Sequence, residues 1–197
     1  MLPRSLKLIQ VALFSAIAAI ISMIRFPVFF APSFYRLDLS DTVVLISGFS
    51  LGPYAAVLME FLKIFLKLLL KGSATMGLSD LAKLIMGLAL VLPAIIIYKK
   101  KRTFKGLCIS LIAGVLCTVV VSALMNYFVL LPAFEALFNV SEKKIIEISQ
   151  AINPNVTDRL SFVLLVNCPF NLVESLVVSA LVLLFKKRFG ATTFIPC

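Results

Sequence analysis

Two asparagines and a glutamate interrupt a long apolar stretch near the end of the sequence. Asn167, Asn171 and Glu174 lie at spacings of four and three within NCPFNLVES, and in a helix these spacings place all three side chains on one face. An unpaired carboxylate is costly in an apolar environment, so Glu174 is expected to face a cavity, a cation or a ligand. Amide side chains present a donor beside an acceptor, which matches a heterocycle edge with alternating N–H and C=O groups.

Polar side chains also interrupt three other apolar segments. They are Asn126 and Tyr127 in one segment, Glu60, Lys63, Lys67 and Lys71 in a second, and Asp80 and Lys83 in a third. If the four segments are membrane helices, their polar groups lie at a similar depth and predict a polar pocket that opens to the outside. Two simpler interpretations stay open. A single asparagine such as Asn126 can hold two helices together, and Lys67 and Lys71 can extend to the lipid headgroups.

Aromatic residues lie next to these polar positions. The sequence has 17 phenylalanines and 4 tyrosines, and those nearest the polar positions are Phe34, Tyr35, Tyr127, Phe128 and Phe170. Apolar walls with a few convergent polar groups are typical of small-molecule sites. The residue types therefore favour a planar, partly polar ligand, and they indicate no more than that.

The composition is that of an integral membrane protein. The 197 residues are 61% hydrophobic and 14% charged, whereas a soluble domain is about half apolar and about a quarter charged. The chain has no histidine, and its four cysteines have no metal-ligand spacing, so we expect neither a metal site nor a bound cofactor. The net charge of +10 comes largely from basic runs at residues 99–105 and 186–188, which directly follow apolar segments. Runs in that position are orientation signals, so nucleic acid is not an expected partner.

Six segments are predicted to cross the membrane as helices. A spanning helix needs about 20 mostly apolar residues, and the candidates are residues 6–24, 41–51, 53–70, 79–98, 106–131 and 160–185. Gly52 and Pro53 separate the second helix from the third, and Pro132 is expected to end the fifth. We therefore predict an all-α integral membrane protein in which residues 1–197 form a single six-helix domain.

The distribution of charge predicts the direction of these helices. If the N-terminus is cytoplasmic, the basic runs all fall on the cytoplasmic side and the outer loops carry a balanced mixture of charges. The positive-inside rule therefore places both termini in the cytoplasm. Residues 141–153, in the last outer loop, are expected to form a short surface helix that ends before Pro154.

The first apolar segment is expected to stay in the protein as a helix, because it lacks a small-residue cleavage site before Arg25. Ala12, Ala16 and Ala19 give this helix a smooth face, and the first two have small-xxx-small spacing. Such a face allows two helices to approach closely. Packing within the bundle and docking onto another membrane protein are equally compatible with it. The last residues, ATTFIPC, carry no pattern that predicts a structure.

Several stretches of the sequence resemble a known family. YRLDLSDTVVLISGFSLGPYAAVLMEFLK (residues 35–63), MNYFVLLP (125–132) and PFNLVES (169–175) resemble the riboflavin-specific S components of energy-coupling factor (ECF) transporters. GSATMGLSDLAKLIMG (72–87) is similar to the start of the fourth helix of that family, including the acidic position of Asp80. The resemblance is collinear and covers nearly the whole chain.

The resemblance implies a riboflavin-binding subunit of an importer in the bacterial cytoplasmic membrane. It implies that Asn126 and Asn171 hold the isoalloxazine ring, and that the loop around Leu37 to Asp41, with Asp38 and Leu39, closes over the site. Ala12 and Ala16 would then dock on a transmembrane coupling subunit, which acts with two ATPase subunits. The chain itself has no GxxxxGK[ST] sequence, so ATP hydrolysis is expected to occur in those partners.

The sequence departs from the family at Glu174, where a lysine is common. An acidic residue there either reverses a hydrogen-bond donor into an acceptor or is paired by Lys63 or Lys83. Another vitamin is an alternative ligand, and so is flavin mononucleotide, since the lysine stripe that begins at Lys63 could accommodate its phosphate. An intramembrane enzyme acting on a lipid is the remaining alternative. It is disfavoured because Asp38 and Asp41 are the only paired acids beside a span and have no second acidic cluster.

Overall fold

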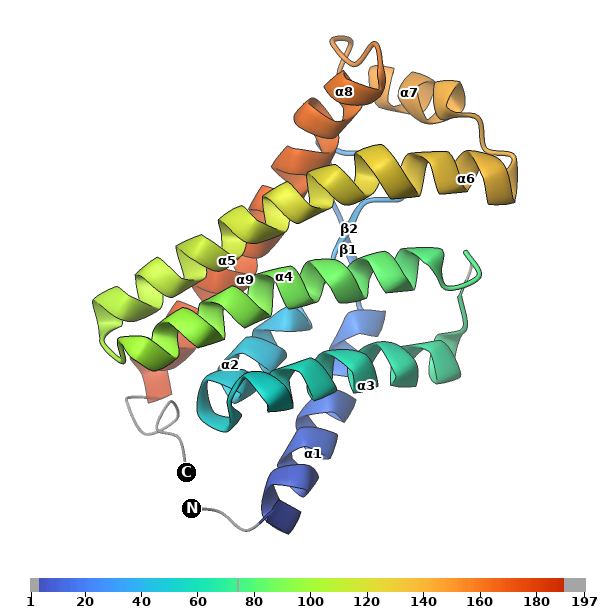
Figure 1. Cartoon of the computed structure of the whole chain (residues 1–197). Coiled ribbons are helices and arrows are strands. Elements are labelled where there is room, and N and C mark those ends of the chain that lie inside the picture. The colour runs from blue at the N-terminus through green and yellow to red at the C-terminus, as the bar shows by residue number, and fades with distance from the viewer. Residues whose placement is uncertain (1–3, 74, 190–197) are drawn as a thin grey trace.

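Helices account for most of the described chain, and a short β-hairpin joins the first two helices (Figure 1). The computed structural model describes residues 4–73 and 75–189. The α-helices are α1 Arg4–Met23, α2 Asp41–Leu51, α3 Pro53–Lys71, α4 Leu78–Lys100, α5 Phe104–Met125, α6 Leu131–Phe138, α7 Glu142–Gln150, α8 Arg159–Phe162 and α9 Cys168–Phe189. Two π-helical turns, η1 Asn126–Leu130 and η2 Val163–Asn167, continue into α6 and α9, and the strands are β1 Phe26–Pro27 and β2 Arg36–Leu37.

The short helix α2 lies at the centre of the bundle. It contacts α1, α3, α4 and α9, and Val44 and Leu45 on it are fully buried. A helix surrounded in this way is apolar on every side, as its sequence is. The predicted bounds of α2 are confirmed. Gly52, at φ 94°, ends it, and Pro53 begins α3 because a proline at the first helical position loses no hydrogen bond.

Helices form in all six segments predicted to cross the membrane, but they differ in length and polarity. Among the described residues, four helices are long and apolar enough to span a bilayer. They are Ser5–Met23, Leu78–Lys100, Phe104–Phe138 and Arg159–Arg188. At 11 residues α2 is too short for this criterion, and α3 carries four charged side chains. The chain is therefore a mostly helical protein with four membrane-capable helices.

The expectation that Pro132 ends the fifth helix is wrong. The helix continues through η1 and α6 to Phe138 and ends at Asn139, whose φ is 51°. Proline normally disrupts a helix because it has no N–H and clashes with the preceding turn. Here a wider turn comes first, and the N–H of Leu131 donates to the carbonyl of Asn126, five residues back. The widened turn accommodates the proline without ending the helix.

A proline follows the second π-helical turn at the same distance. The N–H of Cys168 donates to the carbonyl of Val163, and Pro169 comes next in the chain. The helix is therefore locally irregular just before Pro169, where it forms a π-helical turn. Both π-helical turns carry an asparagine from the polar set, Asn126 at the start of η1 and Asn167 at the end of η2.

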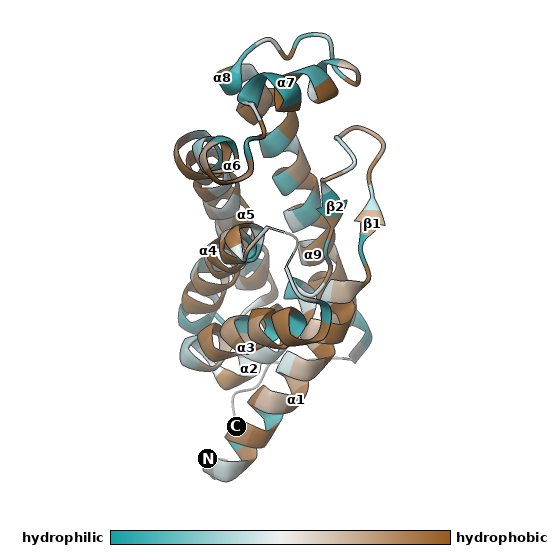
Figure 2. Ribbon diagram, turned by 90° about the vertical axis from the view of Figure 1, so that its right-hand side faces the viewer, coloured by the Kyte–Doolittle hydropathy of each residue, from teal (hydrophilic) through white to brown (hydrophobic). Residues whose placement is uncertain are grey.

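The connection between α1 and α2 is a hairpin that the sequence did not predict. Phe26 pairs with Leu37 and Pro27 with Arg36 in antiparallel register. Figure 2 shows this hairpin beside α9, where its second arm leads into α2. The hairpin therefore brings residues of the first loop to the polar face of the last helix.

The predicted surface helix is confirmed as α7. The side chain of Ser141 accepts a hydrogen bond from the N–H of Lys143, and the helix ends at Gln150, before Pro154. Arg159 forms an ion pair with Glu142 and joins α7 to the start of α8. Figure 2 shows α7 and α8 as more hydrophilic than the neighbouring ends of α5 and α6.

Gly114 sets the spacing between α4 and α5, which pack closely against each other. A Cβ atom at this position would lie 2.5 Å from the backbone carbonyl oxygen of Leu90. Gly114→Ala is therefore expected to lower the unfolding free energy by about 1–3 kcal/mol, because the two backbones must separate. Thermal unfolding in detergent, followed by circular dichroism, measures the change. Leu116→Ala, on an exposed position of the same helix, is the control, and an equal melting temperature for the two variants would contradict the prediction.

Candidate ligand-binding site

Three side-chain donors converge on the amide oxygen of Asn167. The Nδ2 atoms of Asn126 and Asn171 lie 2.8 Å and 3.0 Å from it, and the Tyr35 hydroxyl lies 3.1 Å from it. Asn167 is fully buried. A buried amide oxygen needs such partners, because an unsatisfied polar group in an apolar bundle costs free energy. We call Asn126, Asn167, Asn171 and Tyr35 the amide cluster.

The two π-helical turns bring the amide cluster together. They lie against each other in the fold, so Asn126 and Asn167 meet although 41 residues separate them. Asn126 Nδ2 also donates to the carbonyl of Ser122 at 3.0 Å, and Asn171 Nδ2 donates to the carbonyl of Asn167 at 2.9 Å. The predicted stripe of Asn167 and Asn171 is thus a contacting pair. The contacts of Asn167 with Asn126 and Tyr35 could be found only from the folded structure, because these residues are far apart in the sequence.

Glu174 lies one turn further along α9 and has two partners. Its Oε1 accepts from Lys83 Nζ at 3.0 Å and from the backbone N–H of Asp38 at 2.8 Å. Lys83 Nζ also lies 3.7 Å from Asp38 Oδ2. Of the two lysines considered from the sequence, Lys83 is therefore the partner of Glu174. Through Glu174, α4, α9 and the loop after the hairpin are joined at one point.

Lys63 is held by two other carboxylates. Its Nζ lies 2.5 Å from Asp41 Oδ1 and 2.6 Å from Glu60 Oε2. Glu60 is fully buried, and its Oε2 lies 2.8 Å from the position that a Cβ atom would take at Gly87. A larger residue at position 87 would therefore displace this carboxylate. The charge of Lys63 is therefore neutralised inside the protein, by carboxylates of α2 and α3.

Lys67 does not extend to the headgroups, as one interpretation of the sequence had it. It is 5% exposed and forms an ion pair with Asp80, the acidic residue at the start of α4. A buried carboxylate within reach offers the ammonium group a better partner than the distant lipid surface. Lys71, one turn later, is exposed, as expected.

The polar groups of α2, α4 and α9 face a common cavity. Its polar lining comes from these helices and from α5, and consists of Asp41, Lys83, Thr118, Asn171, Glu174 and Ser175. Its apolar wall is formed by Met86, Leu90 and Val178, together with Gly87. The cavity holds about 20 Å³, room for about one water molecule. A heterocycle of several rings enters only if the loop bound to Glu174 separates from α9.

The aromatic residues expected to form walls divide into two groups. Tyr35 and Phe170 pack together with ring centroids 4.6 Å apart, directly beside the amide cluster. Burial, with Cys168 and Glu174 nearby, raises the pKa of Tyr35 above its usual value, so its hydroxyl stays a hydrogen-bond donor. Phe34 and Phe128 are exposed, and the ring of Phe34 lies 5.1 Å from that of Tyr35 between centroids. Tyr127 packs against Phe128 and under the guanidinium group of Arg159, 5.6 Å from the ring centre.

The remaining predicted positions are located as follows. Leu39 packs half-buried against the main apolar core, two residues before the start of α2. On α1, Ala12 is exposed, Ala16 is half-buried and Ala19 is 1% exposed. Ala19 therefore packs inside the bundle, and only the first two alanines belong to the accessible face.

Sequence reasoning missed the part played by Tyr35 and Glu60. Tyr35 was expected as an apolar wall, whereas its hydroxyl completes the amide cluster. Glu60 was recognised only as part of a charged stripe, and its burial against Gly87 depends on the packing of α3 on α4. No spacing rule links these residues to their partners. Within the described residues, no group of three or more His, Cys, Asp or Glu side chains could hold a metal ion.

Residues 6–185 match the family model described as the ECF transporter, substrate-specific component. The chain belongs to this family. The S component is 31% identical over 188 residues to the riboflavin transporter RibU of Staphylococcus aureus (strain TCH60), covering 93% of this chain and 90% of that protein. It is also 31% identical over 129 residues to the riboflavin transporter FmnP of Bacillus subtilis (strain 168), covering 65% and 68% of the two chains.

A solved structure supports the same assignment. The fold of this S component is similar to one described as "Structure and mechanism of the S component of a bacterial ECF transporter", with a TM-score of 0.73 and 29% identity. The similarity covers 95% of this chain and 96% of the other. The S component is thus an integral membrane protein and a transporter subunit.

The charge on Asp38 stabilises the folded loop. Burial opposes its ionisation, but Lys83, Lys63 and hydrogen bonds at Ser40 outweigh burial and lower the pKa of Asp38 from 3.8 to about 2. A lowered folded pKa stabilises the protein above the unfolded value, and this stabilisation, about 2 kcal/mol, is lost as the pH falls from about 4 to about 2. The melting temperatures of the wild type and Asp38→Asn should therefore differ most near pH 6 and converge toward pH 2. A difference that stays constant over this range would contradict the prediction.

Proposed function

We propose that this S component binds riboflavin from outside the cell and delivers it inward as part of an ECF importer. The observation that carries the proposal is that Asn171 of the amide cluster and the Lys83–Glu174 pair line the same cavity, while the rest of the cluster is held against Asn171 through the amide oxygen of Asn167. Asparagine amides match the alternating N–H and C=O groups at the edge of the isoalloxazine ring. The relatives that are named riboflavin transporters support this choice of ligand.

We infer that Lys83 supplies the positive charge that the family resemblance leads one to expect at position 174. Lys83 lines the cavity, and its ammonium nitrogen lies 3.0 Å from Glu174. The pair then offers a ligand one cationic donor and one anionic acceptor. The ring edge would be recognised by the two side chains together, with the donor coming from α4 and the acceptor from α9.

Entry of the ligand requires the loop of residues 36–40 to move. The cavity is far smaller than a three-ring heterocycle, and the loop is held to α9 by the hydrogen bond from Asp38 N–H to Glu174. A ligand that displaces the loop from Glu174 opens the cavity. The ligand can then donate a hydrogen bond to the Glu174 carboxylate in place of the Asp38 N–H. Asp38 and Leu39 then close over the bound ligand.

Asn171→Ala is expected to weaken riboflavin binding by about 10- to 100-fold, because it removes one or two buried hydrogen bonds to the ring. Quenching of riboflavin fluorescence, titrated with purified protein in detergent, measures the affinity. Asn155→Ala, in the exposed loop before α8, is the matched control and should bind like the wild type. If the wild type is folded and does not quench riboflavin, the proposed ligand is wrong. If Asn171→Ala binds as tightly as the wild type, the proposed site is wrong.

Phosphorylated riboflavin is the second candidate ligand, and the structure weighs against the residue suggested for its phosphate. Lys63 is 3% exposed and lies between two carboxylates. Its charge is therefore already balanced. Lys83 lines the cavity, and its charge is paired with Glu174. Riboflavin without a phosphate is therefore the better match to the cavity.

We also propose that the S component crosses the membrane six times as a single domain, with both termini in the cytoplasm. In this arrangement α2 and α3 are the second and third crossings, packed among the four apolar helices. The basic residues after α4 and at the end of α9 lie on the cytoplasmic side. The acidic and basic residues around α7 lie outside, above the riboflavin site.

Cysteine labelling tests this orientation. In a variant without the native cysteines, Lys143→Cys should react with a membrane-impermeant maleimide on intact cells, because α7 lies outside. Lys101→Cys, after α4, should react only once the membrane is opened. Both positions are exposed to solvent, so accessibility to the reagent depends on the side of the membrane. The reverse pattern would overturn the orientation, and labelling of both on intact cells would overturn the number of crossings.

We propose that α1 docks on the membrane-embedded coupling subunit, which two cytoplasmic ATPases would drive. Ala12 and Ala16 lie on the accessible face of α1, beside the exposed side chains of Leu8, Leu13 and Ile20. Small residues within an apolar surface allow another helix to approach closely. Ala19 is not part of this proposed docking surface, because it packs inside the bundle.

Ala12→Phe is expected to reduce riboflavin uptake by cells at least tenfold while leaving riboflavin binding to the purified subunit unchanged, because the added ring blocks close helix contact. Val120→Phe, at an exposed position of α5, is the control and should leave both uptake and binding unchanged. A loss of binding in folded Ala12→Phe would place this residue in the ligand site instead. Normal uptake would remove α1 as the docking helix.

A further inference from the structure

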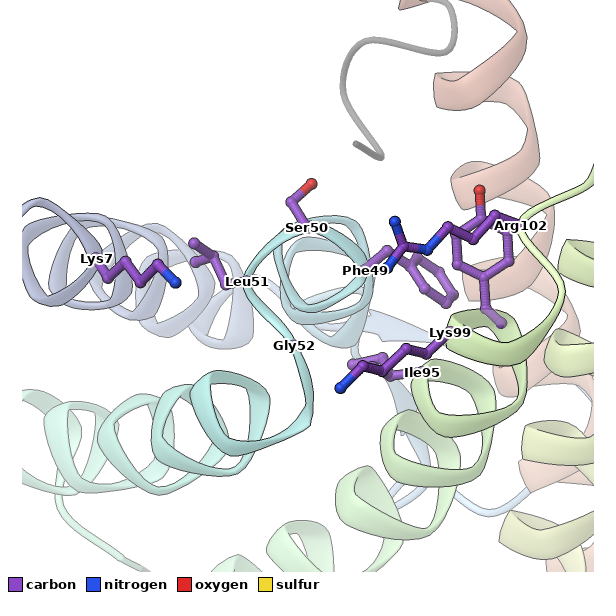
Figure 3. A pocket seen from close by; sticks show the side chains of 9 residues that line it. Lys7, Phe49, Ser50, Leu51, Gly52, Ile95, Lys99 and Arg102 are labelled. Carbon is purple, nitrogen blue, oxygen red and sulfur yellow. The ribbon is translucent and has the colours of Figure 1, made fainter. Parts of the chain in front are cut away.

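A second pocket lies at the end of the bundle opposite the amide cluster. The helices α2 and α4 begin beside the riboflavin site, and their far ends, Leu51 and Lys100, mark the other end of the bundle. There a cavity of about 130 Å³ opens between the start of α1, the turn joining α2 to α3, and the end of α4. Figure 3 shows Lys7 and Lys99 extending toward the turn at Gly52 from either side.

The pocket has a basic rim and an apolar floor. Lys7, Lys99 and Arg102 form the rim, and none of the described residues that line the cavity is acidic. Across the described chain, none of these three side chains takes part in an ion pair. The floor consists of buried apolar and aromatic side chains, among them Phe49 and Tyr98, whose rings are 4.9 Å apart. This contrasts with the riboflavin site, where the lysines of α3 and α4 are balanced by carboxylates.

We propose that this pocket binds a phosphate group carried by an anionic phospholipid or by a soluble phosphate ester. Three cations that have no ion-pair partner among the described residues surround this cavity and attract an anion, and basic pockets between membrane helices are suited to phosphorylated headgroups. The volume limits the ligand. At about 130 Å³ the cavity is smaller than the roughly 300–1,000 Å³ of sites for drug-sized molecules, so a phosphate and its first neighbours fit and a flavin nucleotide does not.

The surroundings of the pocket favour the lipid as the source of the phosphate. Leu8 and Ile9 follow Lys7 on α1 and are each 61% exposed, and Ile96 beside Lys99 is 46% exposed. Acyl chains attached to a phosphate in the pocket would therefore lie along an apolar surface. Orientation signals require only that basic residues lie on the correct side of the membrane. That rule does not require Lys7, Lys99 and Arg102 to line a single cavity. Binding of a phospholipid headgroup explains why they do.

Native mass spectrometry of the full chain released from detergent tests this site. The probes are phosphatidylglycerol and phosphatidylcholine with identical acyl chains, and glycerol 1-phosphate as the soluble phosphate ester. The pocket variant is Lys99→Gln with Arg102→Gln. The matched control is Lys100→Gln with Lys101→Gln, which removes the same charge from the same end of α4 at residues outside the pocket.

The wild type and the control should retain phosphatidylglycerol in preference to phosphatidylcholine, and the pocket variant should bind it roughly 30-fold more weakly, since each basic residue near an anionic headgroup changes affinity about fivefold. Retention of glycerol 1-phosphate alone, lost in the pocket variant, would support the site with a soluble ligand as its source. Equal weakening in both variants, or binding of neither phosphate compound, would overturn the proposal. Unchanged riboflavin binding in the two variants shows that they are folded.

Discussion

Charged and amide side chains inside an apolar bundle must find partners, and this requirement organises the half of the S component that holds the amide cluster. An unpaired charge in such surroundings costs far more than a bundle of this size gains from any single contact. Lys63, Lys67 and Lys83 each meet a carboxylate that comes from another part of the chain. The pairs join α2 to α3, α3 to α4, and α4 to α9. The positions of these helices relative to one another therefore depend on electrostatic pairing as much as on apolar packing.

The buried asparagine side chains also have hydrogen-bond partners, and π-helical turns bring two of them together. Asn126 and Asn167 meet because each lies in a π-helical turn, and each turn precedes a proline by two residues. Proline removes a backbone donor, and a wider turn is one way for a helix to continue past it. The irregular backbone and the polar side chains thus occur together in both helices. The proposed ligand site, in the middle of two long apolar helices, depends on these two local departures from α-helical geometry.

Much of this architecture could be predicted from the sequence. The break at Gly52 and Pro53 follows from local backbone rules, and the facing of Asn167, Asn171 and Glu174 follows from helical periodicity. Local rules failed at Pro132, where the π-helical turn allowed the helix to continue, and at Lys67, whose partner Asp80 is 13 residues away. The hairpin after α1 and the contact of Tyr35 with Asn167 depend on the packed fold. No spacing within a segment carries that information.

The loop is attached to α9 through a main-chain group, the N–H of Asp38, rather than through a side chain. Every amino acid except proline provides that group. The sequence of the loop can therefore change during evolution without loss of this one hydrogen bond, provided that the receiving carboxylate at position 174 is kept. Relatives with different loop residues could share the same closing contact. Differences in the loop side chains would then be free to adapt to the part of the ligand that they cover.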